Sequence, residues 1–214
     1  MIEIDHVFMF VESEFEAEVR AEALGLVETY RRTHKGQGTS NVCFCFDNCF
    51  LEMIWIDDAS AVRSKPISRT KLYERSQWQV LQTCRFGIAW RGELLKSGIN
   101  FWPFKPPYLP PNLEVLISTD TDDEKQPMLF TFPGTVAPAK WALERRKDLQ
   151  HRSGFGSVTS IELTMPLNIK ACATLKWLEA QTILTLRKGS TTNYSMTMSI
   201  NDLNDNPTKY LDLT

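Results

Sequence analysis

The amino-acid sequence predicts an α+β fold built from two related modules. Residues 1–58 read as a strand, a helix and three further strands, a βαβββ order. Residues 151–214 again give a strand, a helix and more strands, a divergent βαββ-type module. Of the 214 residues, 43% are hydrophobic and 23% are charged, a globular composition that can bury one large core. We therefore expect one compact domain made of paired modules.

The first strand is predicted at residues 2–11, "IEIDHVFMFV". Strict alternation places Ile4, His6 and Phe8 on one face, with Val7 and Met9 on the other. His6 is thus a single ligand-type side chain on an otherwise apolar face.

A helix is predicted directly after this strand. Ser13 can cap it, and Glu16 lies three residues later at the spacing of a capping box. Phe15 and Val19 recur at helical spacing, which indicates the buried face. Gly25 is expected to end the helix.

Three strands complete the first module. They are predicted at 26–32, 42–48 and 49–56, with the glycine-rich loop "HKGQGTSN" at 34–41 between the first two. From residue 59 to 150 we expect a connecting segment. It contains a predicted helix at 68–82, a polar helical stretch at 139–150, and strands at 85–91, 113–118 and 127–132. A proline- and aromatic-rich stretch in this segment is expected to be extended.

Charge and cysteine content narrow the partners and the compartment. The formal net charge is -2 with interspersed signs, so no electrostatic footprint predicts a nucleic-acid or membrane partner. Five cysteines without a CxxC pair favour a reducing compartment, and we expect the cytoplasm. The start "MIEIDHVFMF" lacks the basic and apolar regions of a signal peptide, and no apolar run approaches the length of a membrane span.

Glu52 stands inside an otherwise apolar strand, where an ionised carboxylate must be paired, hydrogen-bonded or bound to a metal. In a curled βαβββ sheet the first and fourth strands bring His6 and Glu52 over the same face. Imidazole and carboxylate ligands suit zinc, iron, manganese or nickel. The residues alone leave three interpretations open: a metal site, a buried His6–Glu52 ion pair, and a protonated Glu52 bonded to backbone.

Further polar and aromatic residues are candidates for ligand binding. The loop at 34–41 either places a polar cluster at a cavity rim or satisfies its own backbone. Aromatic residues of the proline-rich stretch either line a pocket or fill the core. His151 either enters the cavity or is structural. The candidates are His34, Gln37, Thr39, Asn41, Trp102, Tyr108 and His151.

A resemblance to a known family is carried by the stretches "IDHVFMF", "THKGQGTSNVCFCFDNCFLEMIWI", "FGIAWR", "PPYLPP" and "HRSGFGSVTSIEL". Together they resemble the glyoxalase-like domain proteins of the vicinal oxygen chelate superfamily. The resemblance implies βαβββ modules with curled mixed sheets around a shared cavity, and a divalent metal on the first and fourth strands of each module. His6 and Glu52 match the ligands of the first module. Aligning the C-terminal module on the first places Ser160 and Thr197 at the other two positions, and neither is a typical ligand.

Two functional hypotheses follow. In the first, a metal on His6 and Glu52 supports lyase, isomerase or dioxygenase chemistry on vicinal oxygens, with Glu52 or His34 as base and with water, substrate, His34 or His151 completing the metal. In the second, a metal-free protein binds or sequesters a small molecule through Trp102, Tyr108 and the loop of His34. A purely structural role is a third interpretation. The superfamily's habit of pairing modules suggests a homodimer.

Overall fold

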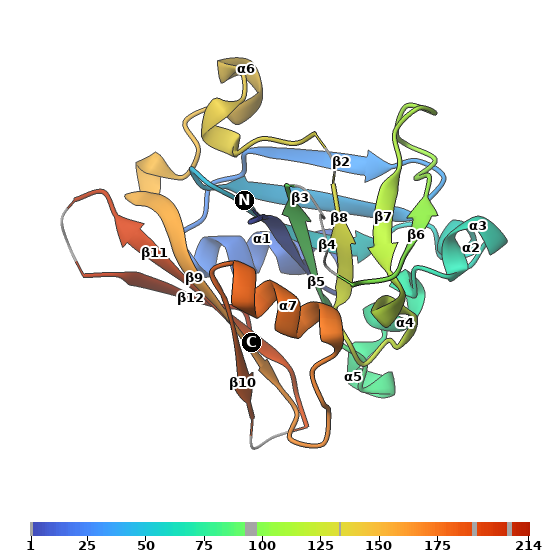
Figure 1. The fold of residues 1–214 in the computed structure, drawn as a ribbon. Helices are drawn as coiled ribbons and strands as arrows, with labels where there is room; N and C mark the ends of the chain where they lie inside the picture. The colour runs from blue at the N-terminus through green and yellow to red at the C-terminus, as the bar shows by residue number, and fades with distance from the viewer. Residues whose placement is uncertain (1, 93–97, 133, 190–191, 205–206) are drawn as a thin grey trace.

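The computed structural model describes residues 2–92, 98–132, 134–189, 192–204 and 207–214. Among these residues, an eight-stranded sheet has the order β2-β3-β4-β1-β5-β8-β7-β6 and a four-stranded sheet the order β10-β9-β11-β12 (Figure 1). The strands are β1 (Glu3–Phe10), β2 (Tyr30–His34), β3 (Thr39–Cys45), β4 (Phe50–Ile56), β5 (Phe86–Arg91), β6 (Phe101–Phe104), β7 (Val115–Ser118), β8 (Met128–Thr131), β9 (Phe155–Met165), β10 (Leu184–Lys188), β11 (Ser195–Asp202) and β12 (Lys209–Asp212).

The helices are short and lie mainly between strands. They are α1 (Glu14–Ala23), α2 (Ala59–Val62), α3 (Lys65–Ser68), α4 (Leu72–Ser76), α5 (Trp78–Leu81), α6 (Leu143–Arg146) and α7 (Ala173–Gln181), with 3-10 turns η1 (Thr119–Asp122), η2 (Pro138–Lys140) and η3 (His151–Ser153). No described helix has the length and apolar character needed to cross a bilayer.

The first module has the predicted βαβββ order. β1 pairs with β4 in parallel, and β3 joins β4 and β2 in antiparallel pairs. The Ser13 hydroxyl accepts the Glu16 backbone N–H at 3.2 Å, which confirms the predicted cap of α1. The predicted inner face is wrong, because Phe15 is 73% exposed and Ala17 is fully buried.

The second half of the eight-stranded sheet comes from β5 to β8. β5 is parallel to β8, β8 is antiparallel to β7, and β7 to β6, which repeats the pairing of the first module. An antiparallel β1–β5 pair joins the halves. The sequence predicts the second module at 151–214, whereas the strand pairing gives this position to residues 86–131. An order of elements along the chain does not specify which strands hydrogen-bond to one another.

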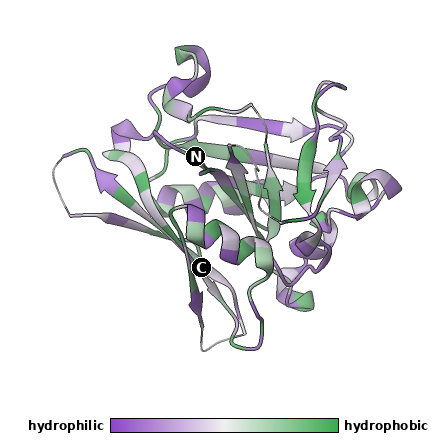
Figure 2. Cartoon of the chain, in the orientation of Figure 1, coloured by the Kyte–Doolittle hydropathy of each residue, from purple (hydrophilic) through white to green (hydrophobic). Residues whose placement is uncertain are grey.

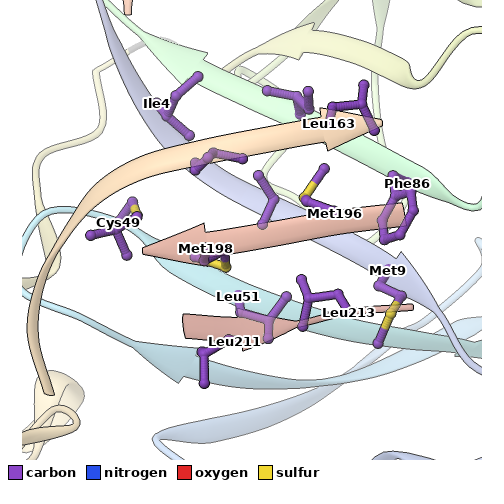
Figure 3. Close-up of a cluster of buried hydrophobic side chains, with 14 of the residues drawn as sticks. Ile4, Met9, Cys49, Leu51, Phe86, Leu163, Met196, Met198, Leu211 and Leu213 are labelled. Atoms are coloured by element: carbon purple, nitrogen blue, oxygen red, sulfur yellow. The ribbon is translucent and has the colours of Figure 1, made fainter. Parts of the chain in front are cut away.

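The C-terminal segment forms the four-stranded sheet, which packs against one face of the larger sheet. Figure 3 shows the side chains between them, from Ile4, Met9, Cys49, Leu51 and Phe86 on one side and Leu163, Met196, Met198, Leu211 and Leu213 on the other. Helix α7 lies on the same core, where Trp177 meets Trp90 with ring centroids 6.0 Å apart. Hydrophobic residues run along these strands, whereas the α6 segment is largely hydrophilic (Figure 2).

Two predicted helical stretches are broken in the structure. The stretch at 68–82 gives α4 and α5, separated at Gln77 and preceded by Lys71 in the left-handed region at φ 59°. Arg75 fastens α4 to the segment before β8, because its buried guanidinium donates to several backbone carbonyls there, including Thr121 at 3.0 Å. The stretch at 139–150 contains only η2 and α6.

Candidate functional site

A cavity of about 340 Å³ lies on the face of the eight-stranded sheet that is turned away from the four-stranded sheet. This volume is in the range of small-molecule sites. Its walls are largely apolar, from residues that include Phe8, Ile54, Phe104, Val115, Met128 and Phe130. The ionisable and amide side chains that reach it are Asp5, His6, Arg32, His34, Gln37, Asn41, Glu52 and Arg145.

A β-bulge in β1 brings two adjacent polar residues to this cavity. The β1–β5 register pairs Ile4 with Trp90 and His6 with Ala89, so Asp5 is the extra residue. Strict alternation would have sent Asp5 and His6 to opposite faces. Because of the bulge both line the cavity, while Ile4 packs in the core beside the four-stranded sheet, contrary to the predicted face.

Asp5 fixes the ring of His6. Asp5 Oδ1 lies 2.8 Å from His6 Nδ1. Asp5 Oδ2 accepts the Thr135 hydroxyl at 2.7 Å and lies 3.4 Å from Arg91 Nη1. Burial alone would raise the pKa of Asp5. The hydrogen bond and charge of His6, the hydrogen bond from Thr135 and the charge of Arg91 together hold this pKa below its usual value. Asp5 is therefore ionised, and it favours the tautomer in which His6 Nδ1 carries the proton and Nε2 faces the cavity.

Glu52 is held by an amide. Its Oε1 accepts Asn41 Nδ2 at 2.6 Å, and its Oε2 lies 3.7 Å from His6 Nε2. The Arg32 backbone N–H donates to Asn41 Oδ1 at 3.0 Å, which turns the amide nitrogen of Asn41 towards Glu52. The amide of Asn41 and the imidazole of His6 thus lie on different oxygens of the buried carboxylate.

His34 is joined to the same cluster. Asn41 Nδ2 lies 3.3 Å from His34 Nε2, and His34 Nδ1 lies 2.8 Å from the Thr39 hydroxyl. The ring stacks on Tyr108 with centroids 4.3 Å apart. Burial lowers the pKa of His34, although the charge of Glu52 acts in the opposite direction. The structure therefore favours a neutral His34 that accepts from Asn41 and donates to Thr39.

The structure brings together part of the predicted set. His34, Gln37, Asn41 and Tyr108 line the cavity with His6 and Glu52. Thr39 lies behind His34 and also accepts Gln37 Nε2 at 3.0 Å.

Two other candidates point elsewhere. Trp102 lies on β6 beneath the Arg69 guanidinium, 4.4 Å from the ring centroid, and does not line the cavity. The His151 side chain is 42% exposed and pairs with Asp47 at 2.7 Å. Sequence reasoning missed Asp5, Arg32 and Arg145, and for Asp5 the only available signal was its adjacency to His6.

The donor set around the cavity bears on the expected metal. His6 and Glu52 are suitable ligand types, but the paired strands of the second half present Ala89, Met128 and Phe130 on the cavity side. In the part of the chain that the structure describes, no three or more His, Cys, Asp or Glu side chains form a group that could hold a metal ion. The residues do not fit a metal centre held by four protein ligands.

The alignment that placed Ser160 and Thr197 opposite His6 and Glu52 is corrected by the fold. Both residues lie in the four-stranded sheet, where Ser160 Oγ donates to Ser199 Oγ at 2.9 Å and Thr197 pairs with Glu162 and Asp212. The expectation failed because it rested on the order of elements, whereas position in the sheet depends on pairing.

Comparisons with known proteins agree with this architecture. Residues 4–91 match a family model described as a glyoxalase-like domain. A hypothetical protein from Staphylococcus aureus has a TM-score of 0.53 at 9% identity, covering 89% of this chain and 88% of its own. Methylmalonyl-CoA epimerase from Mycobacterium tuberculosis has a TM-score of 0.41 at 13% identity, over 62% of this chain and 87% of that one. No curated protein matches.

The matched segment shows a similarity to a class of domain. Residues 4–91 resemble a glyoxalase-like domain, which agrees with the resemblance that the sequence predicted. The mixed sheets and few helices of the chain confirm the predicted α+β fold. The matched segment contains β1 to β5 and thus carries His6, Asn41 and Glu52.

Proposed function

We propose that the protein binds a small organic molecule in the cavity and transfers a proton to or from it, with His6 as the acid–base group. The observation that carries this proposal is the placement of His6, whose Nδ1 lies 2.8 Å from Asp5 while Nε2 faces Glu52 and the cavity. General acid–base catalysis requires a titratable group that is oriented and within reach of the bound molecule.

The chemistry follows from the three side chains. His6 Nε2 accepts a proton from an acidic C–H or O–H group of the bound molecule, and the imidazolium that forms is stabilised by the carboxylates of Asp5 and Glu52. The proton is returned from Nε2 to a second atom of the molecule, which completes an isomerisation. Phe50 stacks on the His6 ring at 4.4 Å and keeps its plane fixed during both steps.

The test uses proton exchange, since no substrate needs to be known beforehand. Small carbonyl compounds with acidic α-protons are incubated with the protein in D₂O, and loss of each C–H signal is followed by NMR. We expect exchange with wild type and with His151→Asn, whose imidazole lies outside the cavity. His6→Asn should slow it by roughly 10²-fold or more.

The alternative is a protein that binds a small molecule without chemistry. Compounds that bind wild type and stabilise it thermally, while none of them exchanges a proton, would favour this alternative. The cavity and its apolar walls support both hypotheses equally, and the Asp5–His6 pair favours the first.

Metal binding by His6 and Glu52, which the resemblance implies, has a measurement of its own. Because the described strands of the second half offer no ligands on the cavity side, we expect elemental analysis of wild type, before and after incubation with zinc, iron, manganese or nickel salts, to show less than stoichiometric metal. A stoichiometric metal that is lost in Glu52→Gln would make Glu52 a ligand and overturn this expectation.

A further inference from the structure

We propose that the molecule bound in the cavity carries an anionic group, a carboxylate or a phosphate, and that Arg32 and Arg145 bind it. This inference rests on the proposed function of the same cavity and specifies the chemical class of its ligand. Both guanidinium-bearing residues line the cavity, on the side where β2 and the α6 segment meet it.

Arg32 differs sharply from its neighbour Arg31. The Arg31 guanidinium is paired with three carboxylates, those of Glu14, Glu18 and Glu28. Side chains alternate along β2, so Arg32 points to the opposite side and reaches the cavity with Tyr30 and His34. No ion pair of Arg32 occurs among the residues that the structure describes. An adjacent pair of arginines thus has one member satisfied by the protein and one turned to the cavity.

Arg145 on α6 lines the cavity, whereas its neighbour Arg146 does not. The Arg145 guanidinium lies over the Trp141 ring, 3.8 Å from the centroid, and it too has no ion pair within the described ranges. Arg146 Nη1 donates to the Lys147 carbonyl at 3.3 Å. Stacking on Trp141 holds the Arg145 guanidinium flat and leaves its N–H edges available to an oxyanion.

An aromatic row connects Arg145 to the acid–base group, and Arg32 lines the same cavity. Trp141 and Tyr30 have centroids 6.2 Å apart, and both rings lie near Phe50, at 5.9 and 6.3 Å. Phe50 in turn stacks on His6 at 4.4 Å. The cavity therefore has an acid–base end at His6, an apolar and aromatic middle, and a cationic end.

The charges of the cavity support a ligand with an anionic group at the end where the two arginines lie. The carboxylates of Asp5 and Glu52 have partners of their own at the His6 end, namely Thr135, Arg91 and Asn41. The two arginines of the cationic end have no carboxylate partner among the described residues, and guanidinium groups form paired, charge-assisted hydrogen bonds with carboxylate and phosphate oxygens. A ligand with its acidic proton at one end and its anionic group at the other matches both ends.

The experiment compares a carboxylate with its neutral amide and adds a phosphate on the same phenylpropyl group. Wild-type protein is titrated by calorimetry with 3-phenylpropionate, its neutral amide 3-phenylpropionamide, and 3-phenylpropyl phosphate. We expect an anion to bind roughly tenfold or more tightly than the amide, and the stronger of the two anions identifies the group. Arg32→Gln and Arg145→Gln should each remove most of this difference.

The neighbouring arginines supply matched controls. Arg31→Gln and Arg146→Gln remove the same charge from the same elements outside the cavity, and both should keep the preference for the anion. Equal binding of anion and amide by wild type would overturn the anion proposal and leave the proposed function standing, as would equal losses in all four variants. A third outcome is that binding depends on Arg32 and Arg145 while the protein exchanges no proton. This outcome would overturn the proposed proton transfer and support the anion site. Binding of none of the three probes would count against both.

Discussion

Each ring nitrogen of His6 faces a different carboxylate, that of Asp5 at 2.8 Å and that of Glu52 at 3.7 Å. At the scale of single residues, this arrangement determines what the site can do. Asp5 is kept ionised by its partners, so it stabilises a positive charge on the ring. Asn41 orients Glu52 on the other side.

Asp5→Asn should slow the proton exchange as much as His6→Asn does. The amide no longer stabilises the imidazolium or selects the tautomer, so we expect the exchange rate to fall by about 10²-fold with little change in ligand affinity. Glu3→Gln is the control, because Glu3 binds the same Arg91 at 2.7 Å without touching His6. Equal losses in the two variants would indicate a structural effect.

His34 gives the stability of the protein a specific pH dependence. Its pKa is lowered from 6.5 by burial, so as the pH falls the unfolded chain binds the proton before the folded chain does. The free energy of unfolding should be highest above pH 6.5 and decrease below it. Urea unfolding between pH 5 and 8 should show a smaller decrease for His34→Gln than for wild type. A slope that is unchanged in this variant would contradict the prediction.

At the scale of elements, the turn between β2 and β3 positions His34 and Asn41. Gly38 has φ 84°, and a Cβ at this position would lie 2.3 Å from the Asp58 carbonyl oxygen and 2.6 Å from the Val62 nitrogen. The turn therefore requires glycine for its conformation and for the close approach of the α2 segment.

Gly38→Ala should destabilise the protein more than Gly25→Ala does. Gly25 has φ 67°, and a Cβ there would meet no atom within 4 Å, so its substitution should cost about 1 kcal/mol from backbone strain alone. Gly38→Ala adds a clash with backbone atoms and should also weaken ligand binding at His34. Urea midpoints and calorimetry measure both effects, and similar midpoints for the two variants would argue against the clash.

At the scale of the whole molecule, the four-stranded sheet supports the cavity from behind. Met196 and Met198 are fully buried between the sheets, against β1 and β4, whose opposite faces carry His6 and Glu52. The site is thus built on strands that have a packed core on their far side.

Met198→Ala should lower the free energy of unfolding by about 2–5 kcal/mol, because it leaves a cavity in this core. Leu167 is 67% exposed, and Leu167→Ala should change stability by less than about 0.5 kcal/mol. Denaturant unfolding measures both, and a Met198→Ala variant as stable as wild type would show that the interface between the sheets contributes little.

The local features of this protein follow from its sequence alone. The alternation of apolar residues, the Ser13 cap and Gly25 predicted the βαβββ order, and single polar residues in apolar strands pointed to His6 and Glu52. These signals depend on spacing along one segment, which held for the order of elements but not for the faces of Ile4 and Phe15.

Which segments meet depends on contacts that form only in the folded chain. Residues 86–131 rather than 151–214 complete the larger sheet, and the bulge at Asp5 depends on the register between β1 and β5. The convergence of Arg145 with Arg32 likewise joins elements far apart in the chain. The physical reason is that strand pairing and packing are contacts between distant residues, whose partners no local periodicity specifies.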